Sequence, residues 1–244
     1  LLTGYLLGAI PFCFLIGKLY GVDIRTLGSG NVGATNLRRG LTGKPLGRLM
    51  AGLGLFLDGL KGYTSAFWLP PLAVHFLAPT QPYPISAEWL PVTAGVAAVL
   101  GHTFTVFLKF RGGKGVATGI GMFLAICLPA ALVGIAVFVV IFAITRISSL
   151  GSLVGAASVP VASCVYYHYT STIAEHAPVV GMLVGVVVLV FIRHRANIGR
   201  LMRGEELSFR AQEKAAEAAA AAAGTSTQAS VATEPVEKVE RSAH

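Results

Sequence analysis

Charge is what this sequence has least of. Asp, Glu, Lys and Arg make up only 12% of its 244 residues, whereas a soluble domain carries about 25%. Hydrophobic residues account for 54% of the chain, so an ordinary soluble domain is excluded and an all-α polytopic membrane protein is predicted. The net charge of +8 therefore does not indicate a nucleic-acid partner, because basic residues also orient membrane proteins.

Metal and nucleotide motifs are also missing. The cysteines Cys13, Cys127 and Cys164 lie apart in apolar runs, which makes neither a metal-ligand spacing nor a disulfide framework, and we expect small buried side chains. A Walker A loop is excluded because Lys114 is followed by Gly115 rather than by Ser or Thr. We expect no metal and no cofactor.

Apolar segments divide the chain into candidate membrane helices, each of which needs about 20 apolar residues. They cover residues 1–20, 49–74, 87–108, 116–145, 150–167 and 178–192. Segment 116–145 would be about 45 Å long as one helix, which is long for one span and short for two. Pro129 is placed to break it, because proline cannot donate an intrahelical hydrogen bond.

Positive charge predicts the orientation. Lys and Arg gather in residues 21–48, 109–114 and 193–203, while residues 62–108 and 147–192 contain none. If all three basic segments are cytoplasmic, the long fourth apolar segment must cross twice. We therefore predict seven transmembrane helices, some of them short, with the N-terminus outside and the C-terminus cytoplasmic. Five or six crossings are the alternatives.

Composition changes near the end of the chain. Residues 1–207 are predicted to form one integral membrane domain, and residues 208–244 a cytoplasmic tail. The tail contains the run AQEKAAEAAAAAAG, whose alanines favour a short helix by propensity. The low-complexity remainder is predicted to be disordered.

The first of three polar stretches on the predicted cytoplasmic side is GSGNVGATNLRR, residues 28–39. Its glycines permit positive φ, so successive amides can converge on an anion. The polar side chains add neutral donors and a guanidinium suited to phosphate. A flexible basic loop is the alternative. The candidate binding residues are Gly28, Ser29, Gly30, Asn31, Gly33, Thr35, Asn36 and Arg39.

The second stretch is GHTFTVFLKFRGGKGVATGIG, residues 101–121. Its RGGKG run directly precedes an apolar helix, and backbone amides at a helix N-terminus favour anions. A short basic turn is the alternative. The candidates are Gly112, Gly113, Lys114 and Gly115. His102 falls near the end of a span, as either a hydrogen-bonded packing residue or a catalyst.

The third stretch is RHRANIGRLMRGEE, residues 193–206. Its arginines could contact anionic lipid headgroups, but His194 and Asn197 are also spaced to share one helical face. Glu206 could anchor the arginines.

Two ionisable residues fall inside the second apolar segment. Asp58 and Lys61 are three positions apart there, and ionisable groups within a membrane are costly and are functional candidates by default. An internal ion pair that fixes helix packing is the alternative.

Together these stretches resemble the motifs of the bacterial acyl-phosphate:glycerol-3-phosphate acyltransferase family (PlsY), integral membrane enzymes of phospholipid synthesis. The pattern G-S-G-N-x-G-A-T-N-x-x-R is matched by residues 28–39, and H-R-x-N-I-x-R-L-x-x-G-x-E by residues 194–206. The pattern G-H-x-F-P-V-F-L-K-F-K-G-G-K-G-V-A-T is matched by residues 101–118, except that Thr105 replaces proline and Arg111 replaces lysine. The intramembrane D-x-x-K-G is also similar.

The resemblance implies a reaction and a location. It implies transfer of a fatty acyl group from acyl phosphate to the sn-1 hydroxyl of glycerol 3-phosphate, which yields lysophosphatidic acid and inorganic phosphate as the first acylation of phospholipid synthesis. The enzyme would be a multi-pass protein of the bacterial cytoplasmic (inner) membrane, with its site facing the cytoplasm. Its partners would be the two substrates and membrane lipid, with no obligate protein partner.

The resemblance also implies residue roles. Ser29, Arg39, His194 and Asn197 would act on the reacting groups, and Lys114 with the glycines around it would help bind the acyl phosphate. Asp58, Lys61, His102 and Glu206 would support them. The hydroxyl proton could go to His194 or to a substrate phosphate with a second pKa of about 6. Ser29 as a covalent nucleophile is disfavoured because no base is evident nearby.

Two other classes of protein fit part of this pattern. A membrane transporter of an organic phosphate would use the basic loops and the Asp58/Lys61 pair, although no matching broken helices are visible in two halves of the chain. A non-catalytic anchor for anionic lipid would explain the arginines but not the Asn, Ser and Gly pattern. An acyltransferase with an H-x-x-x-x-D motif is excluded, because none of the six histidines has aspartate five residues later.

Overall fold

The structure, a computed structural model, describes residues 1–77, 89–171 and 173–208, together with tail positions 211, 214, 215 and 218. The regular elements in these ranges are all helical, as predicted. The α-helices are α1 (Leu2–Ala9), α2 (Phe12–Leu19), α3 (Ala34–Gly40), α4 (Gly47–Phe67), α5 (Leu69–Leu77), α6 (Leu90–Thr103), α7 (Val116–Ile126), α8 (Leu128–Thr145), α9 (Ser148–Thr170), α10 (Ile173–Arg193) and α11 (Arg195–Met202), with 3₁₀ turns η1 (Ile24–Thr26) and η3 (Val106–Leu108). The predicted alanine-rich helix falls mostly outside the described residues.

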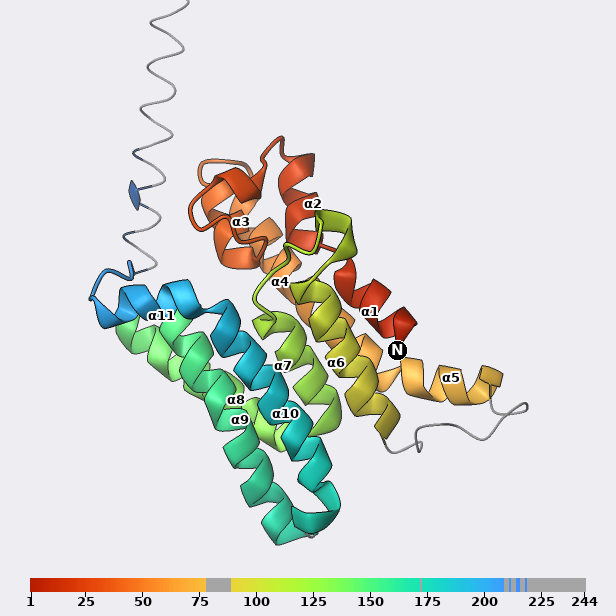
Figure 1. Ribbon diagram of the computed structural model, residues 1–244. Helices are drawn as coiled ribbons and strands as arrows, with labels where there is room; N and C mark the ends of the chain where they lie inside the picture. The colour runs from red at the N-terminus through yellow and green to blue at the C-terminus, as the bar shows by residue number, and fades with distance from the viewer. Residues whose placement is uncertain (78–88, 172, 209–210, 212–213, 216–217, 219–244) are drawn as a thin grey trace, which may run out of the picture.

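The long helices run side by side, and the polar loops gather with α3 and α11 at one end of the molecule (Figure 1). Five segments of the described chain are long and apolar enough to cross a membrane: Leu2–Leu19, Leu90–Leu108, Leu128–Thr145, Ser148–Thr170 and Ile173–Arg193. Helix α7 is apolar but has only 11 residues, and α4 has 21 residues but carries Asp58 and Lys61 within it. The number of crossings therefore stays a prediction.

Proline interrupts the first apolar segment, which the sequence analysis gave as a single candidate membrane helix. A gap separates α1 from α2, because Pro11 has no N–H to continue the helical ladder. Distant donors reach the carbonyls beside the gap: Thr105 Oγ1 donates to Ala9 O at 2.6 Å, and Lys61 Nζ donates to Ile10 O at 2.7 Å. The break is thus held by contacts with α4 and with the segment between α6 and η3.

The long fourth segment divides into two helices, as its charge pattern predicted. The division falls at Cys127, and Pro129 lies in the first turn of α8, where its missing N–H costs no intrahelical bond. The proline therefore begins the second helix. Segment 49–74 also divides, which the sequence did not predict: α4 ends at Phe67 and α5 follows as a separate helix.

Glycine brings α4 and α7 together backbone to backbone. A Cβ at Gly62 would overlap the carbonyl oxygen of Thr118, and one at Gly121 would overlap that of Gly59. Next to this contact, α7, α8, α9 and α10 share a hydrophobic core that includes the fully buried Met122, Val159 and Leu183. Several residues of this core also line the cavity described below.

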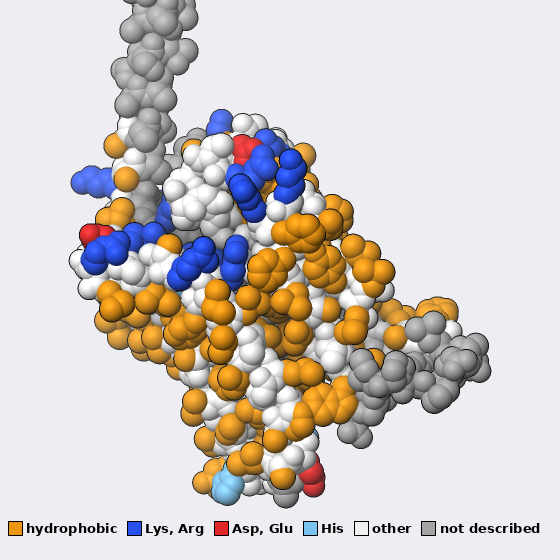
Figure 2. Space-filling view, in the orientation of Figure 1, with side chains coloured by type: hydrophobic (Ala, Val, Ile, Leu, Met, Phe, Trp, Pro, Cys, Tyr) orange, Lys and Arg blue, Asp and Glu red, His pale blue; other side chains and the backbone are white. Residues whose placement is uncertain are grey.

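The surface has two chemically different regions. Hydrophobic side chains cover the flanks of the molecule, and Lys and Arg side chains gather at the end that carries the polar loops (Figure 2). Large apolar residues on the flanks are open, such as Phe56 at 62% and Ile144 at 75% exposure. Such a surface suits lipid rather than water.

Candidate active site

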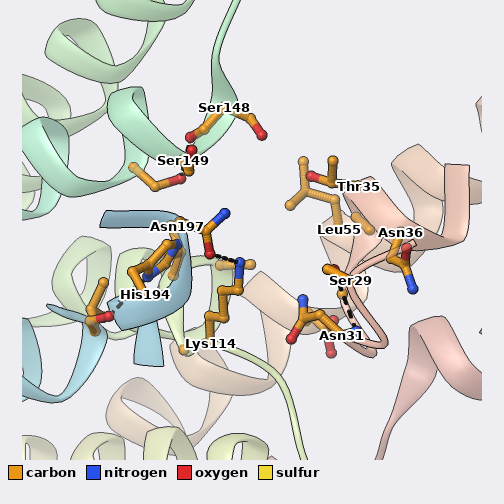
Figure 3. Close-up of a pocket in the computed structure, with 18 of the residues that line it drawn as sticks. Ser29, Asn31, Thr35, Asn36, Leu55, Lys114, Ser148, Ser149, His194 and Asn197 are labelled. Atoms are coloured by element: carbon orange, nitrogen blue, oxygen red, sulfur yellow. Dashed lines mark hydrogen bonds between the residues drawn. The ribbon is translucent and has the colours of Figure 1, made fainter. Parts of the chain in front are cut away.

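One cavity of about 1220 Å³ opens among the polar loops and continues between the helices. Its mouth is lined by the loop before α3, the starts of α7 and α9, and α11 (Figure 3). Its deeper walls are apolar and come from α7, α8, α9 and α10, including Ile120, Phe123, Phe138 and Val186. The polar and apolar parts therefore belong to a single continuous space.

The loop before α3 owes its shape to glycine and to one buried amide. Gly28 and Gly30 have φ values of 50° and 66°, in the left-handed region that favours glycine. Asn36, which is 1% exposed, donates from Nδ2 to Ile24 O at 2.5 Å and to Leu27 O at 3.0 Å. Both amide hydrogens are thus used inside the protein, so Asn36 holds the loop, and its predicted role as an anion donor stays a prediction.

Ser29 and Arg39 face the cavity from opposite ends of this stretch. Ser29 is exposed, and its Oγ accepts a long hydrogen bond of 3.4 Å from the Asn31 amide. The Arg39 guanidinium lies 3.5 Å from Asn36 Oδ1 through Nη1. Its burial lowers the pKa of Arg39, but an arginine remains charged at any physiological pH.

A hydrogen-bonded chain links the second and third polar stretches. Lys114 Nζ donates to Asn197 Oδ1 at 2.6 Å, and Asn197 Nδ2 donates to Glu206 Oε1 at 2.6 Å. Ser149 Oγ donates to the same carboxylate at 2.7 Å, and Arg200 Nε at 2.6 Å. Glu206 therefore orients three donors, of which the arginine was expected from the sequence.

Burial and hydrogen bonding set the charges at this chain. Burial lowers the pKa of Lys114 to about 8, although the charge of Glu206 opposes the shift. Burial tends to raise the pKa of Glu206, but its bonds from Ser149, Asn197 and Arg200 outweigh that effect and hold this pKa below its ordinary value. At neutral pH the Glu206 carboxylate thus lies among several cations.

His194 sits between α10 and α11 and is 3% exposed. Its Nδ1 lies 2.8 Å from Val190 O, and since a carbonyl only accepts, we assign the proton of the neutral ring to Nδ1 and the lone pair to Nε2. Burial, followed by the charge of Lys114, lowers the pKa of His194 to about 4. The ring is therefore neutral near pH 7.

A second polar cluster lies deeper, within the helices. Asp58 Oδ1 is 2.8 Å from Lys61 Nζ and 3.6 Å from His102 Nδ1, and Asp58 Oδ2 accepts from Cys13 Sγ at 3.2 Å. All four residues are buried. Asp58 and His102 reach the cavity wall, but Lys61 does not.

Most of the predicted site residues meet in the cavity wall: Gly28, Ser29, Asn31, Gly33, Thr35, Asn36, Arg39, Asp58, His102, Lys114, Gly115, His194, Asn197 and Glu206. Those that lie off the wall are Gly30, Lys61, Gly112 and Gly113. The amides of Gly112 and Gly113 donate to Thr103 O at 3.1 Å and His102 O at 3.0 Å. In this arrangement both amides are used inside the protein, which gives the two glycines a structural role, and their predicted phosphate binding stays a prediction.

The sequence analysis missed Ser148 and Ser149, which reach the mouth from the first turn of α9 (Figure 3). Their signal is weak but present: two adjacent serines follow Arg146 and begin an apolar helix, where free backbone amides are expected. Among the described residues, no group of three or more His, Cys, Asp or Glu side chains is placed to hold a metal ion.

Comparison with known proteins relates the chain to one family of enzymes. A family model described as glycerol-3-phosphate acyltransferase matches residues 1–204. The chain is 42% identical over 205 residues to a glycerol-3-phosphate acyltransferase of Anaeromyxobacter dehalogenans, covering 84% of this chain and 92% of that one. It is 39% identical over 209 residues to one of Geobacter sulfurreducens, covering 86% and 95%.

Two crystal structures of PlsY (YgiH), an integral membrane glycerol 3-phosphate acyltransferase, are similar to this one. The glycerol 3-phosphate form has a TM-score of 0.68 and 37% identity, and the match covers 85% of this chain and 92% of that chain. The lysophosphatidic acid form has a TM-score of 0.66 and 36% identity, with 84% and 91% covered.

Proposed function

The chain belongs to the glycerol-3-phosphate acyltransferase family, and we propose that it transfers a fatty acyl group from an acyl phosphate to the sn-1 hydroxyl of glycerol 3-phosphate. The products are 1-acylglycerol 3-phosphate and inorganic phosphate, in the first acylation of phospholipid synthesis. Forms of the PlsY structure named for glycerol 3-phosphate and lysophosphatidic acid, the acceptor and the product of this reaction, support the proposal.

The observation that carries the proposal is the continuity of the cavity. A mouth lined by cations and amides opens directly into an apolar space between membrane-type helices. Along α7 the wall runs from Gly115 to Phe123, and along α10 from His194 to Val186, a depth of about 12 Å in each case. A fatty acyl phosphate has the same two-part character, so its chain fits the apolar part while its phosphate stays at the mouth.

The mouth is suited to two phosphates. Arg39, Lys114 and Arg200 supply positive charge at the wall. The first turns of α7 and α9 also border the cavity, through Val116 and Ser149 respectively, and amides at a helix N-terminus favour anions. We assign the start of α7 and Lys114 to the acyl phosphate, and the side formed by α11 and the Ser29 loop to glycerol 3-phosphate.

The chemistry asked of the protein is positioning and charge stabilisation. The acceptor hydroxyl oxygen attacks the acyl carbonyl carbon, the carbon–oxygen bond to phosphate breaks, and phosphate leaves with the bonding electron pair. Because phosphate is already a good leaving group, the main gains come from holding the hydroxyl against the carbonyl. Donors such as Lys114, Arg39 and Ser29 would stabilise the oxyanion and the departing phosphate.

The proton goes to a phosphate oxygen rather than to His194. A general base works best with a pKa near the operating pH, and the pKa of His194 is lowered to about 4, whereas a phosphate monoester has a second pKa of about 6. With its proton on Nδ1, His194 instead offers Nε2 as a hydrogen-bond acceptor that orients the hydroxyl. Ser29 acts as a donor and not as a covalent nucleophile, because the hydrogen bond at its Oγ is with a backbone amide and not with a base.

The helix arrangement supports the predicted topology. Taken in order, α1 with α2, then α4, α6, α7, α8, α9 and α10 alternate in direction along the long axis (Figure 1), which gives seven crossings if the short α7 counts as one. The basic end then faces the cytoplasm by the positive-inside rule. The N-terminus would lie outside, the C-terminus inside, and the cavity mouth at the cytoplasmic face of the bacterial inner membrane.

The test uses purified full-length protein with palmitoyl phosphate and glycerol 3-phosphate. We expect lysophosphatidic acid and inorganic phosphate in equal amounts, with no release when glycerol 3-phosphate is omitted. His194→Ala, which removes the acceptor that orients the hydroxyl, should lower turnover by about 10²-fold, while His194→Gln should retain more activity because it keeps an acceptor.

Other outcomes would contradict the proposal. No phosphate release, combined with uptake of labelled glycerol 3-phosphate into vesicles, would indicate a transporter. An acyl label that stays on the protein and is lost in Ser29→Ala would establish the covalent route instead of direct transfer.

A further inference from the structure

We propose that Asp58, Lys61 and His102 position the Gly112–Lys114 loop, and so set where Lys114 meets the acyl phosphate, without themselves contacting the reacting atoms. The inference rests on the proposed function and adds positioning residues to it. The three side chains come from α4 and α6, whereas the loop connects α6 to α7. They form a path of contacts from the break between α1 and α2 to the cavity mouth.

The path begins with an ion pair inside the apolar part of the molecule. The side chains of Lys61 and Asp58 are 1% and 3% exposed, with Nζ 2.8 Å from Oδ1. Lys61 Nζ also donates to Ile10 O at 2.7 Å, and Cys13 Sγ donates to Asp58 Oδ2 at 3.2 Å. Two charges buried this way cost desolvation energy, and packing alone could be achieved without them. The pair is therefore expected to do more than join helices.

The ion pair faces a histidine ring. His102 Nδ1 lies 3.6 Å from Asp58 Oδ1, and the ring is almost completely buried. The carboxylate thus determines which edge of the ring turns toward α4. The opposite edge, which bears Nε2, turns toward the loop, because a Cβ at Gly113 would overlap Nε2.

The loop backbone is held between this ring and an arginine. Gly113 N donates to His102 O at 3.0 Å, and Gly112 N donates to Thr103 O at 3.1 Å. On the carbonyl side, Arg193 Nη2 donates to Gly112 O at 3.1 Å and Nε to Gly113 O at 3.3 Å. The two glycines lie off the cavity wall, and their backbone N–H and C=O groups all make hydrogen bonds within the protein. They therefore fix the backbone from which the next residue extends.

That next residue is Lys114, which lies on the wall and donates to Asn197. Gly113 packs against the His102 ring. If the ring rotates or is removed, the loop can move into the space that the ring occupied. A shift of about 1 Å in a positioning group costs up to about 100-fold in rate. Since Lys114 is assigned to the acyl phosphate, binding of that substrate should suffer most.

The test separates positioning from packing with the double variant Asp58→Val with Lys61→Met. Removing both charges avoids the single unpaired charge that would destabilise the protein. Ser163→Ala is the matched control, because Ser163 is a fully buried polar residue whose hydroxyl bonds to the Val159 carbonyl of its own helix. Thermal unfolding in detergent and KM for each substrate are measured for all three proteins.

We expect the double variant to unfold near the wild-type temperature, with KM for acyl phosphate raised about tenfold or more and KM for glycerol 3-phosphate within about twofold of wild type. The control should match wild type in both constants. If the double variant does not reach the membrane folded, His102→Asn, which leaves the ion pair in place, is expected to give the same selective rise.

Unchanged KM values would show that the ion pair only packs helices, and equal rises for both substrates would also overturn the inference. A fall in kcat at unchanged KM would make these residues catalytic instead. Failure of the proposed function is a separate result, because it appears in the wild-type protein as absence of lysophosphatidic acid.

Discussion

Lys114 is the residue at which pH acts most directly on the site. Its ammonium is partly buried in the cavity wall near Arg39, Arg200 and Glu206, and its pKa is lowered to about 8. The charged form is therefore present at neutral pH and is lost as pH rises through about 8. The substrate phosphates reach their dianionic form as pH rises through about 6, so the two ionisations bound a working range.

Lys114→Arg should widen that range. For the wild-type enzyme we expect kcat/KM for acyl phosphate to fall above about pH 8, since this constant reports the free enzyme. Arginine keeps its charge, so kcat/KM of the variant should stay constant to higher pH. Its value should be lower than that of the wild type, because a planar guanidinium binds phosphate with a different geometry from an ammonium. Lys44→Arg, at the exposed rim of the cavity, is the matched control and should keep the wild-type profile. If kcat/KM of Lys114→Arg still fell above about pH 8, the ionisation responsible would belong to another group.

Residues within long polar motifs were easier to predict than those outside them. Ser29, Lys114 and His194 stand in runs whose composition is unusual for a membrane protein, and all three reach the cavity. Ser149 stands in an apolar helix, where serine is common, and only the fold brings it to Glu206, which is 57 positions away in sequence. The roles of Gly112 and Asn36 also depended on partners that composition does not reveal.

At the scale of helices, α4 and α7 each contain a glycine at a close contact, and the two contacts are of different kinds. A Cβ at Gly62 would overlap the Thr118 carbonyl, so this glycine is required for close packing. A Cβ at Gly119 would lie 3.6 Å from Val186 Cγ1 at the cavity wall, which is ordinary contact. The second position therefore has room for a methyl group, at the expense of the space proposed for the acyl chain.

Gly119→Ala should change substrate preference without loss of stability. Alanine is favoured over glycine in a helix by about 1 kcal/mol, while its methyl group narrows the apolar space, so we expect kcat/KM for long-chain acyl phosphates to fall about tenfold relative to short ones. Gly62→Ala should instead lower the free energy of unfolding by about 1–3 kcal/mol through overpacking. Chain-length profiles and thermal melts measure both effects. An unchanged profile in Gly119→Ala would mean that the chain runs elsewhere.

Helix interruptions were predicted only where a local signal was sufficient. The division of segment 116–145 followed from counting charges on either side and was confirmed at Cys127. The break beside Pro11 was not predicted, because it is completed by Thr105 and Lys61, which lie 96 and 51 positions from the carbonyls they reach. The proline that the family pattern has at position 105 could not make that bond, whereas threonine can.

For the whole molecule, the central question is which way each end faces. With seven crossings, the turn after α9 lies outside and the loop before α4 lies in the cytoplasm. If α7 and α8 together crossed only once, the turn after α9 would move to the cytoplasm, while the loop before α4 would stay there. His168, exposed near the end of α9, and Pro45, exposed before α4, therefore distinguish the two topologies.

Cysteine labelling tests this directly. In intact spheroplasts, a membrane-impermeant maleimide should label His168→Cys, whereas Pro45→Cys should react only after lysis. The wild-type protein measures background, which should be low because Cys13 and Cys127 are buried and Cys164 is partly buried within α9. Labelling of both positions only after lysis would reduce the count to six crossings. Labelling of Pro45→Cys in intact spheroplasts would place the cavity mouth on the outer face, where cytoplasmic substrates could not reach it.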